Sequence, residues 1–323
     1  MRSSQAWTEA VIESTRDVTP TVREFTLRPA TGVLPHTPGS HLQVQVLVAG
    51  RPQTRSYSLV GRPDGLAWRI AVKRLDDGKG GSLAMWRLVP GDRLQVSEPQ
   101  NHFPMDLDAP ACLLVAGGIG ITPLVGMAQA LHARGVPLRM VYGARSENEL
   151  AFHDELAPVL GDALAACLSD AGTHVDFAAE IAALPEGAQM YVCGPVGMLD
   201  AARRAWAAAG RPVAGLRYET FGSSGRFAPQ AFRVQLPRHR LDIMVPADCS
   251  LLDALERAGV QTISDCKRGE CGLCAMDVLA IDGEIDHRDV FLSDSEKDEG
   301  RRICACVSRV VGSVTLDSAW RPD

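Results

Sequence analysis

Three cysteines lie close together near the C-terminal end of the chain, in the stretch DCKRGECGLC. Four residues separate Cys266 from Cys271, and two separate Cys271 from Cys274. The spacing C-x4-C-x2-C with a distant fourth cysteine is that of plant-type [2Fe–2S] centres, whereas structural zinc sites usually combine two short-spaced pairs. Gly269 and Gly272 suit a loop that wraps a cluster, because glycine adopts positive φ and allows close backbone approach. The stretch therefore predicts an electron-transfer centre, with zinc or buried free cysteines as the alternatives.

The length and composition of the chain limit the possible architectures. With 323 residues it exceeds what one hydrophobic core usually supports, so two or three domains are expected. Its 46% hydrophobic and 22% charged residues are ordinary for a globular protein. No run approaches 18 apolar residues and the start MRSSQAW does not resemble a secretory signal, so we expect no membrane segment. Nine cysteines, four of them isolated, do not resemble a disulfide framework, and a cytoplasmic enzyme is the expectation.

The net charge of −6 is concentrated towards the C-terminus, where the residues from Phe232 onward include 17 acidic and 12 basic side chains. Nucleic acid is not expected as a partner, because phosphate binding needs a basic face. An acidic surface would suit docking onto a basic patch of a partner protein, where complementary charge mainly raises the association rate. A merely solvated acidic surface is the other interpretation.

Short alternating runs dominate the first hundred residues and predict an antiparallel barrel or sandwich. One helix is expected over Ser82–Leu88, with Ser82 as its N-cap. The strand-like runs are VREFTL (22–27), HLQVQVLV (41–48), RSYSLV (55–60), LAWRIAVKR (66–74) and DRLQVSEP (92–99).

From about Ala109 the pattern changes to strand, glycine turn and helix, which predicts a doubly wound parallel sheet. The expected strands are ACLLVAGG, LRMVYGAR, THVDF and QMYVCG, and the expected helices are TPLVGMAQALHARG and the segments 153–160 and 196–209. FGSSGRFAPQAF (221–232) is predicted to be a linker. Two short strands, the helix SLLDALERAG, the cysteine loop and a final strand GSVTLD follow it. The expected domains are residues 1–106, 107–225 and 226–323.

Two motifs in the middle of the chain are candidates for nucleotide binding. GGIGITP follows an apolar strand and opens a helix, where glycines allow close approach and free N–H groups attract phosphate. We expect Thr122 to cap this helix and Pro123 to lie in its first turn, although such a turn can be purely structural. CGP (193–195) ends another expected strand, at the edge where open α/β sheets bind ligands. The alternative for Cys193 is a small buried hydrophobe.

RSYSL places alternating polar and aromatic side chains along an expected strand. Arg55 offers a donor to phosphate, Tyr57 an aromatic face and Ser58 a hydroxyl for the polar edge of a ring, although an ordinary barrel strand would look similar. AVKR (71–74) and GKGGS (78–82) add a lysine and a glycine-rich turn into a helix, a second possible phosphate cradle.

Taken in order, RSYSL, GGIGITP, YGAR (142–145), CGP, ETF (219–221) and the cysteine loop resemble the motifs of the phthalate dioxygenase reductase family. The resemblance covers essentially the whole chain. It implies an antiparallel flavin-binding barrel with FMN, a doubly wound parallel-sheet domain for NADH, and a C-terminal β-grasp ferredoxin domain with a [2Fe–2S] cluster.

The resemblance also assigns roles to individual residues. The flavin would contact Arg55, Ser56, Tyr57, Ser58, Ala71, Val72 and Lys73, and its phosphate would be held by Gly80, Gly81 and Ser82. The pyridine nucleotide would face Gly117, Gly118, Thr122 and Pro123, with its adenosine end near Arg145 and its nicotinamide near Cys193, Gly194 and Pro195. Glu219 would lie close to the hydride path and Phe221 would pack near the flavin, so Cys193, Glu219 and Phe221 are the residues expected at the reaction centre.

These cofactors together imply an electron-transfer reductase. NADH gives up two electrons as hydride and a cluster accepts one, so a flavin between them exchanges either number. The expected acceptor is a separate Rieske-type oxygenase or demethylase, because this chain lacks the Cys-x-His motifs of a Rieske centre. The alternatives are a stand-alone ferric or flavin reductase and a carrier without enzymatic activity. We expect a monomer that prefers NADH, although Arg145 could serve the 2′-phosphate of NADPH.

RRICACVSR supplies two candidates for the fourth cluster ligand, Cys304 and Cys306. Cys304 leaves 29 residues after Cys274, the spacing of plant ferredoxins, and Cys306 leaves 31. On a strand both side chains would point to the same face. The family resemblance favours Cys306, because CVSR followed by VVGSVTLD matches the closing pattern of the family. The predicted ligands are therefore Cys266, Cys271, Cys274 and Cys306.

Overall fold

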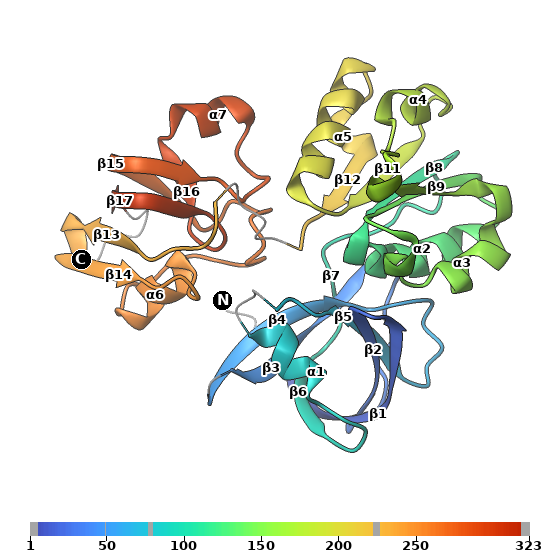
Figure 1. Cartoon of the computed structure of the whole chain (residues 1–323), viewed down its shortest axis with the longest axis horizontal. Helices are drawn as coiled ribbons and strands as arrows, with labels where there is room; N and C mark the ends of the chain where they lie inside the picture. The colour runs from blue at the N-terminus through green and yellow to red at the C-terminus, as the bar shows by residue number, and fades with distance from the viewer. Residues whose placement is uncertain (1–5, 49, 77–79, 222–226, 318–323) are drawn as a thin grey trace. The chain divides into compact units, whose positions relative to one another are not determined.

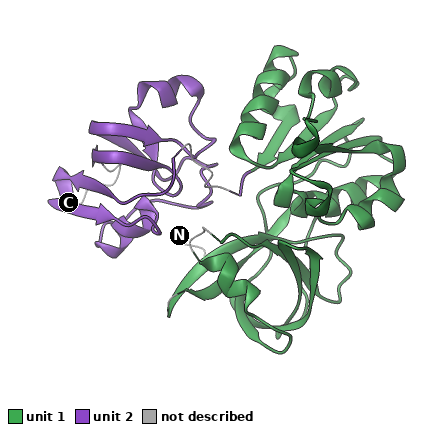
Figure 2. Cartoon of the chain, viewed as in Figure 1, with its two compact units in different colours: residues 1–219 green, residues 220–323 purple. Residues whose placement is uncertain are grey.

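The chain forms two compact units, residues 1–219 and 220–323 (Figure 2). The computed structural model describes the chain apart from residues 1–5, 49, 77–79, 222–226 and 318–323. Each unit has its own core of buried apolar side chains. Among the described residues, no helix is long and apolar enough to cross a membrane.

An antiparallel sheet in the order β4-β3-β6-β1-β2-β5 forms the first half of unit 1 (Figure 1). A bridge between Leu59, just after β4, and Ile70 in β5 brings its ends together, so the sheet curves into a barrel. Alternate side chains fill the interior, among them the fully buried Phe25, Leu27 and Trp68. The strands are β1 (Trp7–Thr19), β2 (Val22–Pro29), β3 (Ser40–Val48), β4 (Arg51–Ser58), β5 (Trp68–Lys73), β6 (Arg93–Ser97) and β7 (Gln100–Asn101), which pairs with β3.

The five strands predicted for the barrel correspond to β2 through β6, but the 13-residue β1 was not predicted. Two register shifts in its pairing with β2, at Ile12/Ser14 and Asp17/Thr19, interrupt the alternation of apolar and polar residues. The sequence WTEAVIESTRDVT therefore lacks a clear period of two, although β1 pairs with both β2 and β6 in the middle of the sheet.

The short helix α1 (Gly81–Trp86) begins one residue earlier than predicted, and Ser82 is not its N-cap. Gly80 holds that position with a φ of 80°, a left-handed conformation that favours glycine. The Ser82 hydroxyl instead accepts a hydrogen bond from the Leu75 amide at 3.1 Å. Glycine geometry, rather than a serine cap, shapes the turn into this helix.

The second half of unit 1 is a parallel sheet in the order β10-β9-β8-β11-β12. Helices α2 and α3 cover one face and α4 and α5 the other, which is the predicted doubly wound arrangement (Figure 1). The strands are β8 (Cys112–Gly117), β9 (Leu138–Ala144), β10 (Leu164–Leu168), β11 (Gln189–Cys193) and β12 (Leu216–Glu219). The helices are α2 (Ile121–Ala133), α3 (His153–Leu160), α4 (Phe177–Ala182) and α5 (Val196–Ala208).

The predicted strand THVDF is wrong. Asp176 in this stretch accepts a hydrogen bond from the Ala179 amide at 3.0 Å and caps α4, so an apolar run was mistaken for a strand where a helix begins. The edge strand is β10, whose alanine-rich sequence LAACL gives little strand signal of its own. Parallel pairing with β9 makes it a strand.

The two halves of unit 1 share a hydrophobic cluster. Val22, Val60 and Ala71 of the barrel pack into the apolar residues that surround α2 and the parallel sheet. A Cβ at Gly126 in α2 would lie 2.4 Å from the carbonyl oxygen of Gly61, just after β4. The helix therefore approaches the barrel at backbone contact.

A four-residue ion network also joins the halves. Arg69 in β5 binds Glu24 in β2 at 2.6 Å and Glu155 in α3 at 3.1 Å. Arg16 of β1 pairs with the same two carboxylates. Glu24 is buried and only 6% exposed, so its charge requires such partners. The network connects three barrel strands to the first helix after β9.

Unit 2 contains a mixed sheet in the order β14-β13-β17-β15-β16. β13 and β17 run parallel and the other neighbours run antiparallel, with α6 packed on the core. The 12-residue β15 and the helix α7 were not predicted. The elements are β13 (Phe232–Leu236), β14 (Leu241–Val245), α6 (Leu251–Arg257), β15 (Ala275–Asp286), α7 (Asp294–Glu299), β16 (Arg302–Cys304) and β17 (Arg309–Asp317).

Two buried arginines hold the segment that leads into β13. Arg288 pairs with the buried Asp286 at 2.6 Å and donates to the carbonyl oxygen of Phe227 at 2.9 Å. Arg309 donates to the carbonyl oxygen of Gln230 at 2.9 Å. Buried charges need such partners, and these bonds fasten the last part of the predicted linker to unit 2. Its residues 222–226 lie outside the described part of the chain.

Candidate active site and cluster-binding loop

The carboxyl ends of the parallel strands carry the motifs expected to bind nucleotide. Ala116 in β8, Cys193 in β11 and Glu219 in β12 lie side by side in the parallel register. Open α/β sheets bind ligands at this edge. The GGIG turn, the CGP loop and the ETF segment therefore begin at neighbouring positions.

The GGIG turn and the CGP loop pack directly against each other. A Cβ at Gly120 would lie 2.1 Å from the carbonyl oxygen of Cys193, and one at Gly117 would lie 2.6 Å from Cδ of Pro195. Contact between the two loops thus requires these two glycines. Gly118 differs, because its φ is 54° and a Cβ there would meet no heavy atom of the described residues within 4 Å. The space beside Gly118 is open to a ligand.

The first residues of α2 follow directly on the GGIG turn and bond back to it. Gly120 occupies the N-cap position, so the predicted cap at Thr122 is wrong. The Thr122 hydroxyl instead donates a hydrogen bond to the carbonyl oxygen of Ile119 at 3.0 Å. Pro123 lies in the first helical turn as predicted.

Met198, in the first turn of α5, fills the space behind these loops. A Cβ at Gly117 or at Gly194 would lie 2.9 Å from its sulfur, and one at Gly143 would lie 3.1 Å from its terminal methyl carbon. Met198 belongs to none of the predicted motifs, although its place in the helix that follows CGP was a usable signal. Cys193 is fully buried, which fits the alternative of a small buried residue.

Arg55 in β4 lies against the glycine turn before α1. A Cβ at Gly81 would lie 2.4 Å from Nε of Arg55, next to the left-handed Gly80. The guanidinium is held by the carbonyl oxygen of Thr54 at 2.9 Å and by the side chain of Gln53. A guanidinium held beside bare glycine backbone fits a phosphate group, and a Cβ at Gly81 would displace that guanidinium.

A buried hydrogen bond joins the barrel to the edge of the parallel sheet. The Ser58 hydroxyl donates to a carboxylate oxygen of Glu219 at 3.4 Å, and the two residues are 4% and 1% exposed. Burial also raises the pKa of the neighbouring Tyr57 phenol, so this ring stays neutral. Ser58 of RSYSL and Glu219 of ETF, which lie far apart in the sequence, thus contribute to one buried site in unit 1.

The other expected flavin residues line the barrel near this point. Ala71 and Val72 in β5 are almost fully buried, and Ser56 in β4 is exposed. The Lys73 ammonium group binds the Glu149 carboxylate at 3.0 Å. This ion pair directs the Lys73 side chain towards the segment after β9.

Two predicted residues lie elsewhere. Arg145 follows β9 with an exposed side chain, and its carbonyl oxygen accepts a hydrogen bond from the Asp170 amide at 3.0 Å. Phe221 lies in unit 2 and is 36% exposed, so its place beside the flavin stays a prediction. Gly78 and Lys79 of the predicted phosphate cradle lie outside the described residues.

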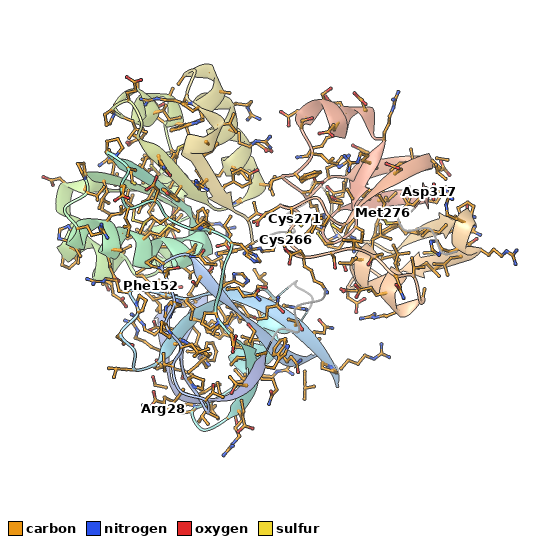
Figure 3. The ribbon with its side chains drawn as sticks, turned by 180° about the vertical axis from the view of Figure 1, so that it is seen from behind. Arg28, Phe152, Cys266, Cys271, Met276 and Asp317 are labelled. Carbon is orange, nitrogen blue, oxygen red and sulfur yellow. The ribbon has the colours of Figure 1, made fainter. Side chains whose placement is uncertain are left out.

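In unit 2 the predicted cysteine loop folds around the sulfur of Cys266. The backbone amides of Arg268, Glu270 and Cys271 each donate to it at 3.4 Å. Cys266 and Cys271 both come from this loop, ahead of β15 (Figure 3). Amides arranged in this way stabilise a thiolate and tune a bound cluster, so the loop fits a [2Fe–2S] group.

The two glycines of the loop have the backbone conformations that the sequence predicted. Gly269 and Gly272 have φ values of 79° and 72°. A Cβ would lie 2.6 Å from Val307 at the first position and 2.2 Å from the ring of Phe291 at the second. Larger residues would be both strained and blocked.

Cys274, Cys304 and Cys306 form a second group of sulfurs. Hydrogen bonds from the Cys304 and Cys306 thiols lower the pKa of Cys274 to about 3, and the same bonds, together with burial, raise the pKa of both donors. The Gly269 amide bonds to Cys306, and the nearby Cys266 thiol helps to raise the Cys306 pKa, whereas the Asp289 carboxylate helps to raise the pKa of Cys304. Cys306 as the fourth ligand stays a prediction, supported by its bond to the loop amide of Gly269.

The predicted placement of both candidates on one strand is wrong. β16 ends at Cys304, and Ala305–Val307 form a turn that the Ser308 amide closes onto the Cys304 carbonyl oxygen at 3.0 Å. Across the described residues, no group of three His, Cys, Asp or Glu side chains is arranged to hold a metal ion. A two-iron cluster divides four thiolates into two pairs, so it needs no such group.

Two domain families match the chain. Residues 236–311 match the 2Fe-2S iron-sulfur cluster binding domain, and residues 114–164 match the oxidoreductase NAD-binding domain. The first match contains the cysteine loop and the second contains the GGIGITP turn. Zinc in place of the cluster is therefore not favoured.

Full-length relatives extend the similarity to the whole chain. Phenoxybenzoate dioxygenase subunit beta from Ectopseudomonas oleovorans is 40% identical over 88% of this chain and 89% of the relative. Heme-dependent oxidative N-demethylase beta subunit from Ectopseudomonas mendocina is 37% identical over 94% and 96%. The solved structure of phthalate dioxygenase reductase matches with a TM-score of 0.77 and 32% identity, over 97% of this chain and 98% of that chain. The chain belongs to the phthalate dioxygenase reductase family.

This reductase is an oxidoreductase with an antiparallel flavin barrel, an NAD-binding domain and a ferredoxin domain, as predicted. The predicted cofactor set of FMN, NADH and a [2Fe–2S] cluster is that of its family. A stand-alone reductase and a non-enzymatic carrier are not favoured, because the relatives are components of dioxygenase and demethylase systems.

Proposed function

We propose that this reductase takes hydride from NADH and delivers electrons through FMN and the [2Fe–2S] cluster to a separate terminal oxygenase or demethylase of Rieske type. The observation that carries the proposal is the buried Ser58–Glu219 hydrogen bond. It joins the strand expected to bind the flavin to the sheet edge expected to bind nicotinamide, within one compact unit.

The residues of this chain supply placement rather than acid–base chemistry. Bound FMN would accept hydride and release single electrons. Arg55 and the glycines at 80 and 81 would hold its phosphate, and the open space at Gly118 would admit the nucleotide. Ser58 and Glu219 would close the site from water, since both are buried.

The flavin is FMN rather than FAD in this proposal. The Arg55 side chain covers the glycine turn, which suits a terminal phosphate, whereas an FAD site must also house an adenosine. Acid-released flavin is expected to run as FMN on chromatography, and FAD in its place would remove this part of the proposal.

NADH is the proposed donor. Asp170 follows β10, and its backbone amide donates to the carbonyl oxygen of Arg145 at 3.0 Å, so an acidic residue and Arg145 are neighbours in the backbone at this sheet edge. An acidic side chain at the ribose position favours NAD over NADP. A higher kcat/KM for NADH than for NADPH is expected, and the reverse order would assign Arg145 to the phosphate. We also place the protein in the cytoplasm, where NADH is supplied.

The acceptor can be tested by stopped-flow reduction with NADH, with and without a purified oxygenase encoded beside this reductase. Rapid reoxidation of the cluster by the oxygenase supports the proposal. Equal turnover with ferric chelates or free flavin, and none with the oxygenase, would favour the stand-alone alternative. A haem oxygenase is the second candidate acceptor, because a relative that spans the whole chain belongs to a heme-dependent demethylase. The haem and iron content of the partner distinguishes the two.

A further inference from the structure

Glu270, between two of the loop cysteines, contacts the cysteine loop through its backbone and a distant segment through its side chain. Its amide donates to the sulfur of Cys266 at 3.4 Å. Its carboxylate accepts a hydrogen bond from the backbone amide of Thr220 at 2.7 Å. One residue thus links a predicted cluster ligand to the first residue of unit 2.

The contact is buried and held from several sides. Thr220 is 1% exposed, and its hydroxyl lies 3.3 Å from the carbonyl oxygen of Arg268. The Arg268 guanidinium binds the second oxygen of Glu270 at 3.3 Å, with both side chains largely buried. A charge-assisted bond at such a place is stronger than an exposed one, because water does not compete for it.

The residue before Thr220 belongs to the other site. Glu219 is the last residue of β12 and accepts the hydrogen bond from Ser58 in unit 1. The Ser58–Glu219 bond lies within unit 1 and the Thr220–Glu270 bond within unit 2. A single peptide bond joins Glu219 to Thr220. Glu270 therefore holds the first residue of unit 2 against the loop that carries Cys266.

We propose that Glu270 is a positioning residue that fixes Thr220, where the chain enters unit 2, to the cluster loop. The transfer of electrons from flavin to cluster would then depend on Glu270, whereas hydride transfer from NADH to flavin would not. The proposal rests on the proposed function, since it assigns a step of that reaction. The bond to the Thr220 amide needs only an oxygen acceptor of this reach, which Glu270→Gln retains, whereas that variant loses the ion pair with Arg268.

Three variants separate this role from a merely structural one. Glu270→Ala removes the acceptor, and Glu270→Gln keeps an oxygen at the same reach. Glu256→Ala is the control, because it removes an exposed glutamate of the same unit that accepts a weak hydrogen bond from Thr262 at 3.5 Å. All three leave the amide of residue 270 in place for the Cys266 sulfur. Iron content and the visible spectrum establish that each full-length protein carries its cluster.

The first readout is independent of turnover. Hydrogen–deuterium exchange measured by mass spectrometry is expected to show faster exchange of the peptide containing Thr220 in Glu270→Ala, and wild-type exchange in the other two variants. The second readout is stopped-flow reduction by NADH. In Glu270→Ala the flavin is expected to be reduced at the wild-type rate and the cluster about tenfold more slowly or worse, with rescue by Glu270→Gln.

Wild-type exchange at Thr220 together with a wild-type rate of cluster reduction in Glu270→Ala would overturn the proposal. A loss in Glu270→Gln as large as in Glu270→Ala would also overturn it, because charge rather than reach would then matter. If Glu270→Ala does not retain its cluster, Glu270→Asp decides, since it keeps the charge but shortens the arm by one methylene. Slow cluster reduction then supports the proposal and a wild-type rate refutes it. A wild-type protein whose flavin NADH does not reduce would refute the proposed function instead.

Discussion

Gly118 and Gly120 lie two residues apart in the GGIG turn, and alanine at each should fail for a different physical reason. At Gly118 a Cβ would enter open space, with a φ of 54° as the obstacle. At Gly120 the φ of −61° suits alanine, but the Cβ would lie 2.1 Å from the Cys193 carbonyl oxygen and 2.5 Å from its carbon. The pair therefore separates a ligand-facing glycine from a packing glycine.

The magnitudes follow from these contacts. The left-handed conformation costs Gly118→Ala about 1–2 kcal/mol, partly offset by about 0.4–1 kcal/mol from a stiffer unfolded chain. Gly120→Ala forces a clash between buried backbone atoms, which places it at the upper end of the about 1–3 kcal/mol typical of overpacking. The apparent melting temperature of unit 1 should fall by about 2–4 °C per kcal/mol, so Gly120→Ala should be clearly the less stable variant.

The assay combines thermal unfolding with NADH-dependent ferricyanide reduction, which reports hydride transfer to the flavin. Gly118→Ala is expected to keep its flavin and most of its stability, while its KM for NADH rises about tenfold, because the added methyl group occupies the space proposed for the nucleotide. Gly120→Ala is expected to lower kcat as well, since it separates the turn from the CGP loop. A wild-type KM in Gly118→Ala would refute the placement of nucleotide at this turn, and a wild-type melting temperature in Gly120→Ala would refute the contact.

Three further changes test the rest of the site. Cys306→Ser should remove or bleach the cluster but spare flavin reduction by NADH, whereas Cys304→Ser should keep the visible cluster spectrum; the opposite result would make Cys304 the ligand. Arg55→Ala should lower flavin occupancy, measured as bound FMN per protein, without changing cluster absorbance. Arg69→Met should reduce the free energy of unfolding by about 2 kcal/mol in urea titration, because it removes one of the partners of the buried Glu24 carboxylate.

Local patterns predicted the elements whose residues determine their own conformation. The apolar run of β8 with its glycine turn, the capped helix α6 after Ser250 and the alternating strands β2 to β6 all show their period in the sequence. The failures have tertiary causes. β10 is a strand because β9 pairs with it, and Ser82 is not a cap because a left-handed Gly80 already forms the turn.

The same division applies to the candidate site. Motifs placed GGIG, CGP and ETF at strand ends, and parallel pairing then brought them to one edge, which sequence reasoning can anticipate. Pairwise contacts between distant segments could not be anticipated. Ser58 and Glu219 are 161 positions apart in the sequence, and neither motif contains a signal that predicts their hydrogen bond.

The choice between Cys304 and Cys306 shows why an assignment from pattern still needs geometry. On a strand their side chains would share a face, and neither loop length nor period could separate them. The chain turns after Cys304, so the two sulfurs approach Cys274 from different backbone positions. Their other neighbours also differ. Asp289 helps to raise the pKa of Cys304, whereas Cys266 helps to raise the pKa of Cys306 and the Gly269 amide bonds to it. A ligand must reach the loop that carries the other thiolates, and the hydrogen bond from the Gly269 amide supports the prediction of Cys306.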